Sequence, residues 1–432
     1  MSAQAPLADR LRRVLDALGC REVEELFRDI PAELRCAAPL RLAAPTSEAD
    51  LSARLLELAA PNTHLDEAVC FLGAGAYDHY VPAVVDAVAA AVGPQLVGPQ
   101  AGQPLLQLVY ELECLFEALT ALDVAAAPLP DGPSALVEAI RLAVAATGRR
   151  EVVLARTLHP VYRSIAATML EGPALTLREV DHHGGVVALD GVQRAVTEAT
   201  ACLVVEHPNF FGCLEDVAAL AAAAHRHGAL LVVKVDPIAL GLLAPPGETG
   251  ADIAVADAQP LGSPPLWGAG SLGLLACRRD LARHLRAWRV EQRPEGLEAA
   301  GSYAPAPVRA DRVVRPVAYL AAVGAEGLAR AAALSASRAH ATLQSIGSIE
   351  GFDRRFRAPF FQEFVVESAH DPEAVAEQLL ESNILGPLAL GEFYPDLDDC
   401  LLFAATERRT KADMDLLHHA LDLLDRGDMV EV

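Results

Sequence analysis

Lysine is the amino acid that this 432-residue sequence most clearly lacks, since only Lys234 and Lys411 occur among 35 basic residues and the others are arginines. Aromatic residues are few, at 5%, whereas hydrophobic residues make up 52%, so the core must be filled by many small aliphatic side chains. The 58 acidic residues bring the formal charge to −23, which repels phosphate backbones and anionic lipid headgroups. The composition therefore argues against nucleic acid and membrane partners.

The sequence also lacks cysteine pairs and long apolar runs. Its eight cysteines form no CxxC pair and several stand in apolar stretches, which predicts buried, reduced thiols rather than disulfides or a metal site. The first residues, MSAQAPLADRLRR, hold no apolar segment of a signal peptide, and the Ala-rich stretches are too short and interrupted to span a bilayer. These absences predict a cytoplasmic protein.

The patterns that are present divide the chain into four segments, as expected for a chain too long for one ordinary core. The segments are a helical N-terminal arm (1–70), a large domain (71–290), a hinge (291–316) and a C-terminal small domain (317–432). In the arm, leucines recur at helical spacing, and Thr46 and Ser47 form the start of a capped helix. The hinge is assigned because its Glu, Pro, Ala and Gly residues show no periodicity.

The large domain alternates apolar strands with helical stretches. The predicted strands are Glu151–Leu154, Ala201–Glu206, Leu230–Val235, Ile253–Ala256 and Leu272–Ala276. Nearly continuous apolar strands that alternate with helices indicate a mainly parallel sheet covered on both faces, with ligands bound at the carboxyl ends of its strands. A smaller α+β lobe follows, so the outline is that of an α/β, fold-type I PLP-dependent transferase of the aspartate aminotransferase type, where PLP is pyridoxal phosphate. Many unrelated domains share such outlines.

Specific motifs carry a family resemblance. They are FLGAGAYDHYVP (71–82), HPNFFG (207–212) with Glu215-Asp216, VDP (235–237), EFVV (363–366) and TERRTK (406–411). In this order they resemble subunit 1 of the two-subunit glycine dehydrogenase (decarboxylating), the P-protein of the glycine cleavage system. The resemblance runs collinearly over almost the whole chain, and it implies a fold-type I structure.

A PLP site needs a lysine for the covalent link, an acid on the pyridinium nitrogen, a planar group on the ring face and donors for the phosphate. The resemblance implies that Asp236 has the position of the acid and His159 that of the stacking group. The position of the lysine is held by Gln259, whose amide cannot form a Schiff base. Lys234 cannot take the place of the missing lysine, because it lies only two residues before Asp236 on the same strand. The resemblance therefore implies that PLP is bound by a homologous subunit 2 and not by this chain.

The candidate residues of a shared or vestigial site are Tyr77, Asp78, His79, His159, Asn209, Asp236 and Gln259. The turn at Gly73 and Gly75 brings the polar side chains of residues 77–80 to a place where they could bind a ligand. The same polar side chains could equally have a structural role and connect the arm to the large domain. We expect His159 and Asp236 to line a cleft that faces residues 73–80, with the Gln259 amide at its floor bonded to Asp236 or to water.

Two departures from the family pattern remove polar groups that could line a shared site. Residues 96–104 replace the family's Pro-Tyr-Gln-Ala-Glu and Ser-Gln-Gly segments, and Ala126-Ala127-Pro128 replaces Asn-Ser-Ser. The leading hypothesis is an accessory subunit of a two-subunit glycine decarboxylase that works with a PLP-bearing subunit 2 and a lipoylated carrier protein. The alternatives are a diverged non-catalytic partner or regulatory subunit of another PLP-dependent enzyme, and an independent enzyme. A hetero-oligomer or a homodimer is expected, because fold-type I proteins build their sites at a dimer interface.

The absence of a suitably placed lysine predicts that the purified chain binds no PLP covalently. Incubation with PLP, borohydride reduction and peptide mapping should find no pyridoxyl-lysine. A stoichiometric adduct on Lys234 would contradict the accessory-subunit hypothesis.

Overall fold

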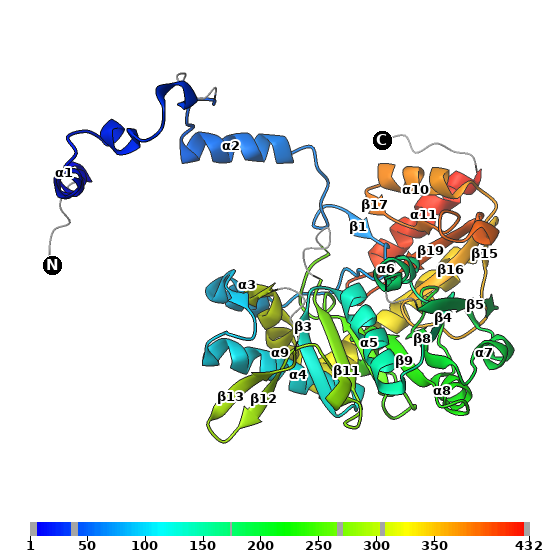
Figure 1. Cartoon of the computed structure of the whole chain (residues 1–432). Coiled ribbons are helices and arrows are strands. Elements are labelled where there is room, and N and C mark those ends of the chain that lie inside the picture. The colour runs from blue at the N-terminus through cyan, green and yellow to red at the C-terminus, as the bar shows by residue number, and fades with distance from the viewer. Residues whose placement is uncertain (1–6, 36–41, 173–174, 266–270, 303–306, 427–432) are drawn as a thin grey trace. The chain divides into compact units, whose positions relative to one another are not determined.

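The computed structural model describes residues 7–35, 42–172, 175–265, 271–302 and 307–426. The chain forms two compact units, residues 1–63 and 64–432. The first unit contains α1 (Leu7–Leu18), η1 (Val23–Phe27), η2 (Ala32–Leu34) and α2 (Glu48–Ala59) (Figure 1). The Ser47 side chain accepts the backbone N–H of Asp50 and caps α2, so the capped helix expected here is confirmed.

A central seven-stranded sheet organises the second unit, with the strand order β3-β11-β10-β9-β8-β4-β5. The strands are β3 (Val124–Leu129), β4 (Glu151–Ala155), β5 (Thr176–Val180), β8 (Thr200–His207), β9 (Leu230–Val235), β10 (Ile253–Asp257) and β11 (Gly273–Cys277). The pairs β10-β9, β9-β8, β8-β4 and β4-β5 are parallel, and β11 is antiparallel to both of its neighbours. The mainly parallel sheet is thus confirmed, with one reversed strand.

Helices cover both faces of this sheet (Figure 1). On one face lie α5 (Gly132–Thr147) and α6 (Pro160–Leu170), and on the other α4 (Gln103–Thr120), α7 (Leu189–Ala195) and α8 (Val217–His225). Alternate strand residues point to opposite faces: Leu203 and Val205 join one apolar cluster, and Cys202 and Val204 join the other. Burial on both faces explains why these strands are apolar throughout.

Two strands of the sheet were not predicted from the sequence, β3 and β5. The sequence of β3 is VAAAPL, with alanines and a proline that favour strands only weakly. Its pairing with β11 and the packing of α4 and α5 against it decide its conformation. The apparent loss of a polar motif at residues 126–128 therefore falls inside a buried strand, close to its carboxyl end.

The predicted hinge, residues 291–316, is wrong as a description of this segment. Residues 289–300 form an antiparallel hairpin of β12 (Arg289–Arg293) and β13 (Gly296–Ala300), and β14 (Val308–Arg309) pairs with β2 (Leu96–Val97). A two-residue Pro-Glu turn before Gly296 closes the hairpin, so cross-strand bonds and not periodicity order the segment. The long helix α9 (Ala310–Ile346) then begins before residue 317; residues 303–306 lie outside the described chain.

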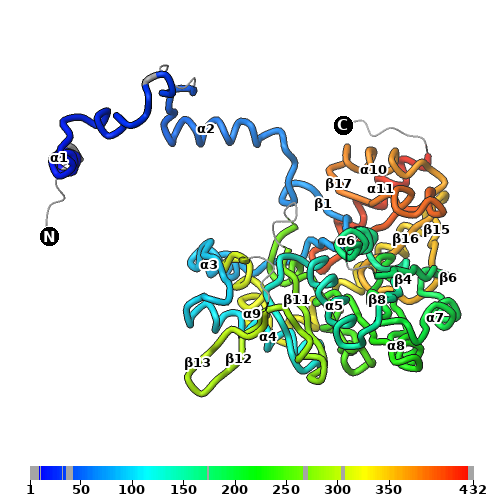
Figure 2. The backbone as a smooth tube through the Cα atoms, in the orientation of Figure 1, coloured from blue at the N-terminus to red at the C-terminus, as the bar shows by residue number. Residues whose placement is uncertain are grey.

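The C-terminal lobe is built on a four-stranded antiparallel sheet, β15-β16-β19-β18. Its elements are β15 (Phe352–Arg354), β16 (Glu363–Ser368), α10 (Pro372–Glu381), β17 (Ile384–Leu385), β18 (Leu388–Ala389), η5 (Pro395–Leu397), β19 (Cys400–Ala404) and α11 (Lys411–Arg426). β1 (Val69–Cys70), expected as the end of the arm, pairs in parallel with β17 and lies in this lobe (Figure 2). Phe71 adds its ring to the core of the lobe.

The remaining elements are short, apart from one helix beside α9. They are α3 (Ala83–Val92), β6 (His182–His183), β7 (Val186–Val187), η3 (Ala239–Gly241) and η4 (Ala282–His284). Among the described helices, only α9 is long and apolar enough to cross a membrane by length and composition. It instead packs on α3, α4 and η3 and is broken at Gly324, where φ is 63°.

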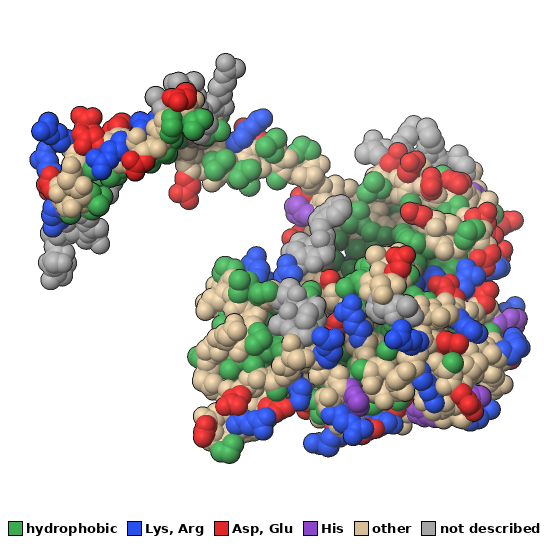
Figure 3. Space-filling view, viewed as in Figure 1, with side chains coloured by type: hydrophobic (Ala, Val, Ile, Leu, Met, Phe, Trp, Pro, Cys, Tyr) green, Lys and Arg blue, Asp and Glu red, His purple; other side chains and the backbone are tan. Residues whose placement is uncertain are grey.

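The surface and the thiols agree with the composition. Acidic side chains gather over the C-terminal lobe around α10, while arginines stand across the large domain below it (Figure 3). Among the described cysteines all seven are free, and only Cys114 is not fully buried. The eighth, Cys36, lies outside the described residues.

The HPNFFG segment joins the large domain to the C-terminal lobe through Gly212. Its carbonyl accepts the backbone N–H of Phe361 at 3.0 Å, and a Cβ at this position would overlap the backbone carbonyl of Glu363. The φ of Gly212 is 78°, a left-handed conformation that favours glycine. Only glycine lets the two backbones approach this closely.

Gly212→Ala should therefore destabilise the protein more than Gly148→Ala. Gly148 has a φ of 71°, but a Cβ there meets nothing within 4 Å, so this control measures the backbone strain alone, about 1–2 kcal/mol. Gly212→Ala adds the steric overlap, which costs about 1–3 kcal/mol or more. Urea unfolding of both variants checks the difference, and equal losses would show that the contact with β16 carries no constraint.

Candidate functional site

The segments after three parallel strands of the central sheet meet residues 73–80, here called the 73–80 loop, at the carboxyl edge of the sheet. His159 follows β4, Asp236 follows β9 and Gln259 follows β10. All three side chains are buried, with at most 9% exposed. A cavity of only about 20 Å³ beside Asp236 is lined by residues that include Tyr77 and Glu363, and His159 and Gln259 are not among its lining residues. This volume holds about one water molecule.

Gln259 forms a two-point clasp on the backbone of Tyr77. Its Oε1 accepts the Tyr77 N–H at 3.1 Å, and its Nε2 donates to the Tyr77 carbonyl at 3.1 Å and to the Ser263 carbonyl at 2.7 Å. A hydrogen bond between Gln259 and Asp236, one of the two partners expected, is therefore not formed. The loop supplies a backbone donor and acceptor at the spacing of a primary amide, and these satisfy Gln259 instead.

Asp236 is held by the C-terminal lobe. One carboxylate oxygen accepts the Ile238 N–H at 2.9 Å, and the other accepts Nε2 of Gln362 at 2.9 Å. Burial raises the pKa of Asp236, and the nearby charge of His79 opposes that rise. The position that resembles the pyridinium acid thus serves as a contact between the lobes.

His159 starts α6 and holds the first turn of the 73–80 loop. Its Nδ1 accepts the Val161 N–H at 3.2 Å, and its Nε2 lies 2.8 Å from the Ala74 carbonyl, so the proton is on Nε2. Burial lowers the pKa of His159, which favours this neutral form. The ring packs against Phe210, 4.9 Å between centroids. Both ring nitrogens are therefore used within the chain.

Tyr77 points into the site and contacts Glu363 at the start of β16. The phenol donates to Glu363 Oε2 at 2.7 Å, and Glu363 Oε1 accepts the Ala74 N–H at 2.6 Å. Burial raises the pKa of Glu363 to about 8 and raises the pKa of Tyr77 well above its usual value. This carboxyl group thus binds the loop from the side of the C-terminal lobe.

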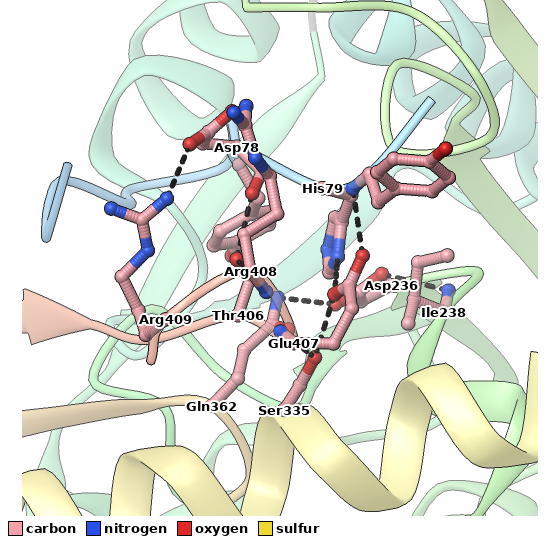
Figure 4. Close-up of polar contacts among 12 residues, drawn as sticks. Asp78, His79, Asp236, Ile238, Ser335, Gln362, Thr406, Glu407, Arg408 and Arg409 are labelled. Carbon is pink, nitrogen blue, oxygen red and sulfur yellow. Dashed lines mark hydrogen bonds and ion pairs between the residues drawn. The ribbon is translucent and has the colours of Figure 1, made fainter. Parts of the chain in front are cut away.

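Asp78 and His79 face the TERRTK motif of the C-terminal lobe (Figure 4). Asp78 pairs with Arg408 and, at 2.7 Å, with Arg409. His79 Nδ1 lies 2.6 Å from Glu407. Burial alone would lower the pKa of His79, but the Glu407 carboxylate raises it overall. These contacts favour the structural role of the cluster, as the joint between loop and lobe.

Asn209 does not join these residues. Its amide nitrogen donates to the Gly185 carbonyl at 2.8 Å and to Glu215 at 2.6 Å, and its oxygen accepts the backbone N–H groups of Phe211 and Cys213. Every hydrogen-bonding capacity of the amide is used to shape the 207–213 turn. Asn209 therefore has no polar atom left for a ligand.

The residues present do not fit PLP. Besides the missing lysine, the helix N-terminus at the start of α5, which could bind a phosphate, already uses its N–H groups on carboxylates. Asp131 accepts the Ser134 N–H at 2.7 Å, and Asp257 accepts the Gly132 N–H at 3.2 Å. A Cβ on Gly132 would overlap the Tyr162 hydroxyl, so no space remains there. Lys234 pairs with Glu206 and lies 4.9 Å from the Tyr162 ring, which commits this buried amine to the core.

Five residues of this site were missed by the sequence interpretation. They are Glu206, Asp257, Gln362, Glu363 and Glu407. Glu363 and Glu407 stood inside motifs that carried the family resemblance, and Glu206 and Asp257 end apolar strands. An acidic residue within a buried strand or a recurring motif is a signal that could have found four of them; nothing in the sequence marks Gln362.

Comparison with known proteins gives consistent matches. A family model described as "Glycine cleavage system P-protein" matches residues 5–290. A protein of Carboxydothermus hydrogenoformans is 38% identical over 436 residues, 96% of this chain and 97% of its own length, and one of Desulforamulus reducens is 36% identical over 429 residues, 94% and 96%. Both are named "Probable glycine dehydrogenase (decarboxylating) subunit 1".

Solved structures agree. An inhibitor-bound glycine decarboxylase (P-protein) of the glycine cleavage system matches with a TM-score of 0.85 and 33% identity, covering 98% of this chain and 99% of the other. Glutamate decarboxylase of Lactobacillus brevis matches with a TM-score of 0.72 and 13% identity over 92% of this chain and 98% of its own, which shows the fold alone. The fold class expected from the sequence is confirmed.

The raised pKa of Glu363 predicts a pH dependence of stability that Glu363→Gln should remove. Since its folded pKa, about 8, lies above the ordinary 4.5, the folded protein keeps a proton that the unfolded chain loses. Stability from this group therefore falls as pH rises from about 4.5 to about 8. Relative to the glutamine variant, the wild type should lose up to about 1.4 kcal/mol per pH unit.

Urea unfolding of the wild type and of Glu363→Gln at about pH 5, 6, 7 and 8 measures how the free energy of unfolding of each protein changes with pH. Taking the difference between the two proteins cancels the other titrating groups, including His79. Parallel pH profiles would show that Glu363 is ionised in the folded protein.

Proposed function

The chain belongs to the family of the glycine cleavage system P-protein, and we propose that it is the accessory, lysine-free subunit of a two-subunit glycine decarboxylase. The family resemblance read from the sequence is thereby confirmed. The observation that carries the proposal is Gln259, clasped to Tyr77 at the position of the cofactor lysine, in a chain collinear with proteins named subunit 1.

The division of labour in the proposed complex follows from this site. PLP is bound by the lysine-bearing subunit 2, where it supplies an electron sink while the α-carboxylate of glycine leaves. The aminomethyl group then passes to a lipoylated carrier protein. This chain contributes no nucleophile; it encloses the partner's site, excludes water and supplies polar contacts from a rigid surface. The proposal places both subunits in the cytoplasm.

The rigidity of this chain supports an enclosing role. The 73–80 loop is bonded to the large domain through Gln259 and His159 and to the C-terminal lobe through Glu363 and Glu407. A surface fixed from both sides loses little conformational freedom when a partner binds.

Co-expression with the lysine-bearing homologue tests the proposal. The two chains should purify together, the PLP absorbance band should belong to the complex and be absent from this chain alone, and glycine should release CO₂ only when both subunits are present. The homologue alone is the control.

Failure of the two co-expressed chains to purify together would contradict the proposal. A complex that decarboxylates another amino acid and leaves glycine unchanged would instead favour a diverged partner subunit.

A further inference from the structure

Asp257, the last residue of β10, accepts hydrogen bonds from donors that converge on its carboxylate. Oδ1 accepts the backbone N–H of Gln259 at 2.9 Å and that of Leu272 at 3.2 Å. Oδ2 accepts the backbone N–H of Gly132 at 3.2 Å and the hydroxyl of Ser271. Because each of these partners donates, the arrangement suits the ionised carboxylate, which can only accept.

The donors belong to segments that the folded sheet brings together. Gly132 begins α5 after β3, Gln259 follows β10, and Ser271 and Leu272 precede β11. These three strands are neighbours in the order β3-β11-β10. The carboxylate therefore lies at the start of α5, where the N–H groups of a helix carry a partial positive charge and attract anions.

The first three residues of α5 have no backbone N–H left for another anion. Asp257 takes the Gly132 N–H, and Pro133 has none. Asp131 takes the Ser134 N–H at 2.7 Å. A phosphate group at this place would find no donor on these residues and would lie beside two carboxylates, whose like charge repels it.

The space beside the start of α5 is also filled. A Cβ on Gly132 would overlap the Tyr162 hydroxyl and would lie 3.1 Å from the Cβ of Asp257. Glycine thus lets the phenol and the carboxylate both pack against the first turn of the helix. Burial raises the pKa of Asp257 and its hydrogen bonds oppose that rise, as expected for a carboxylate that is enclosed by protein.

We propose that Asp257 closes the start of α5 to phosphate-bearing ligands, PLP among them, because the chain's own carboxylate occupies it. This closure is independent of Gln259, so a lysine at position 259 would not by itself make the chain bind PLP. The inference concerns the isolated chain and goes beyond the proposed function, which needs only the absence of the lysine and would stand if the inference failed.

Chemical rescue tests whether the carboxylate fills a site for an anion. Asp257→Ala leaves the donors without their acceptor and should raise the equilibrium constant of unfolding on the order of a hundredfold. Sodium formate supplies the missing carboxylate, and at about ten times its dissociation constant it should lower that equilibrium constant about tenfold. Urea unfolding in formate and in sodium chloride of equal ionic strength measures the difference. An equal response of Asp257→Ala to both salts would overturn the proposal.

Two variants are matched controls. Asp257→Asn keeps the shape of the side chain but exchanges an acceptor for a donor, so it should raise the equilibrium constant of unfolding about tenfold. It should not respond to formate, because the amide fills the space. Asp216→Ala removes the exposed cap of α8, a bond of 3.0 Å from the Ala219 N–H, and should also not respond. A formate response of either control as large as that of Asp257→Ala would show a general salt effect and overturn the proposal.

Gln259→Lys tests whether the closure is independent of position 259. The folded variant is incubated with PLP, reduced with borohydride and mapped, and no pyridoxyl group should be found at position 259. A stoichiometric adduct there would overturn the closure.

The rescue experiment decides the proposal even where a variant folds poorly. If Gln259→Lys does not fold, the formate response of Asp257→Ala is the deciding result. If Asp257→Ala folds only with formate present, its refolding yields in formate and in chloride take the place of the unfolding constants. Equal yields in the two salts, including no folding in either, would overturn the proposal.

Discussion

The ion pairs of Asp78 with the buried Arg409 and the half-buried Arg408 are the interaction on which the rest of the site depends. Asp78 is 4% exposed and Arg409 5%, so these charges are desolvated and must find one another. They connect parts of the chain that are 330 residues apart. Removing one partner from such a pair typically costs about 3–5 kcal/mol. This contact brings the C-terminal lobe against the 73–80 loop, and the neighbouring bonds to Glu363 and Glu407 require that placement.

The buried polar residues at the carboxyl edge of the sheet are satisfied by the 73–80 loop and the C-terminal lobe. Asp236 accepts from Gln362, Gln259 holds Tyr77, and His159 holds Ala74. An unsatisfied buried polar group costs about 1–3 kcal/mol, so leaving these groups open would destabilise the fold. Among the described side chains of this cluster, His79 Nε2 and Gln362 Oε1 still lack a partner.

The architecture also explains why side chains far apart in the sequence gather at one site. Parallel strands bring their carboxyl ends to one edge of the sheet whatever follows them. The side chains that follow β4, β9 and β10 therefore meet in the same place in any chain with this strand order. The residue that follows β10 therefore sets the chemistry at that place, here the amide of Gln259, without changing the sheet, its helices or the C-terminal lobe.

The sequence by itself determined the sheet strands β4, β8, β9, β10 and β11, the family, and the substitution at Gln259, because apolar periodicity and motif order are local properties. It could not determine β3, whose alanines become a strand only against β11, or the β12-β13 hairpin, which cross-strand pairing orders. The partners of Gln259 and Asp236 were likewise decided by the tertiary structure. Gln259 binds Tyr77, 182 residues away, and Asp236 binds Gln362, 126 residues away. No local sequence pattern encodes which distant polar groups become hydrogen-bond partners when the C-terminal lobe packs on the loop.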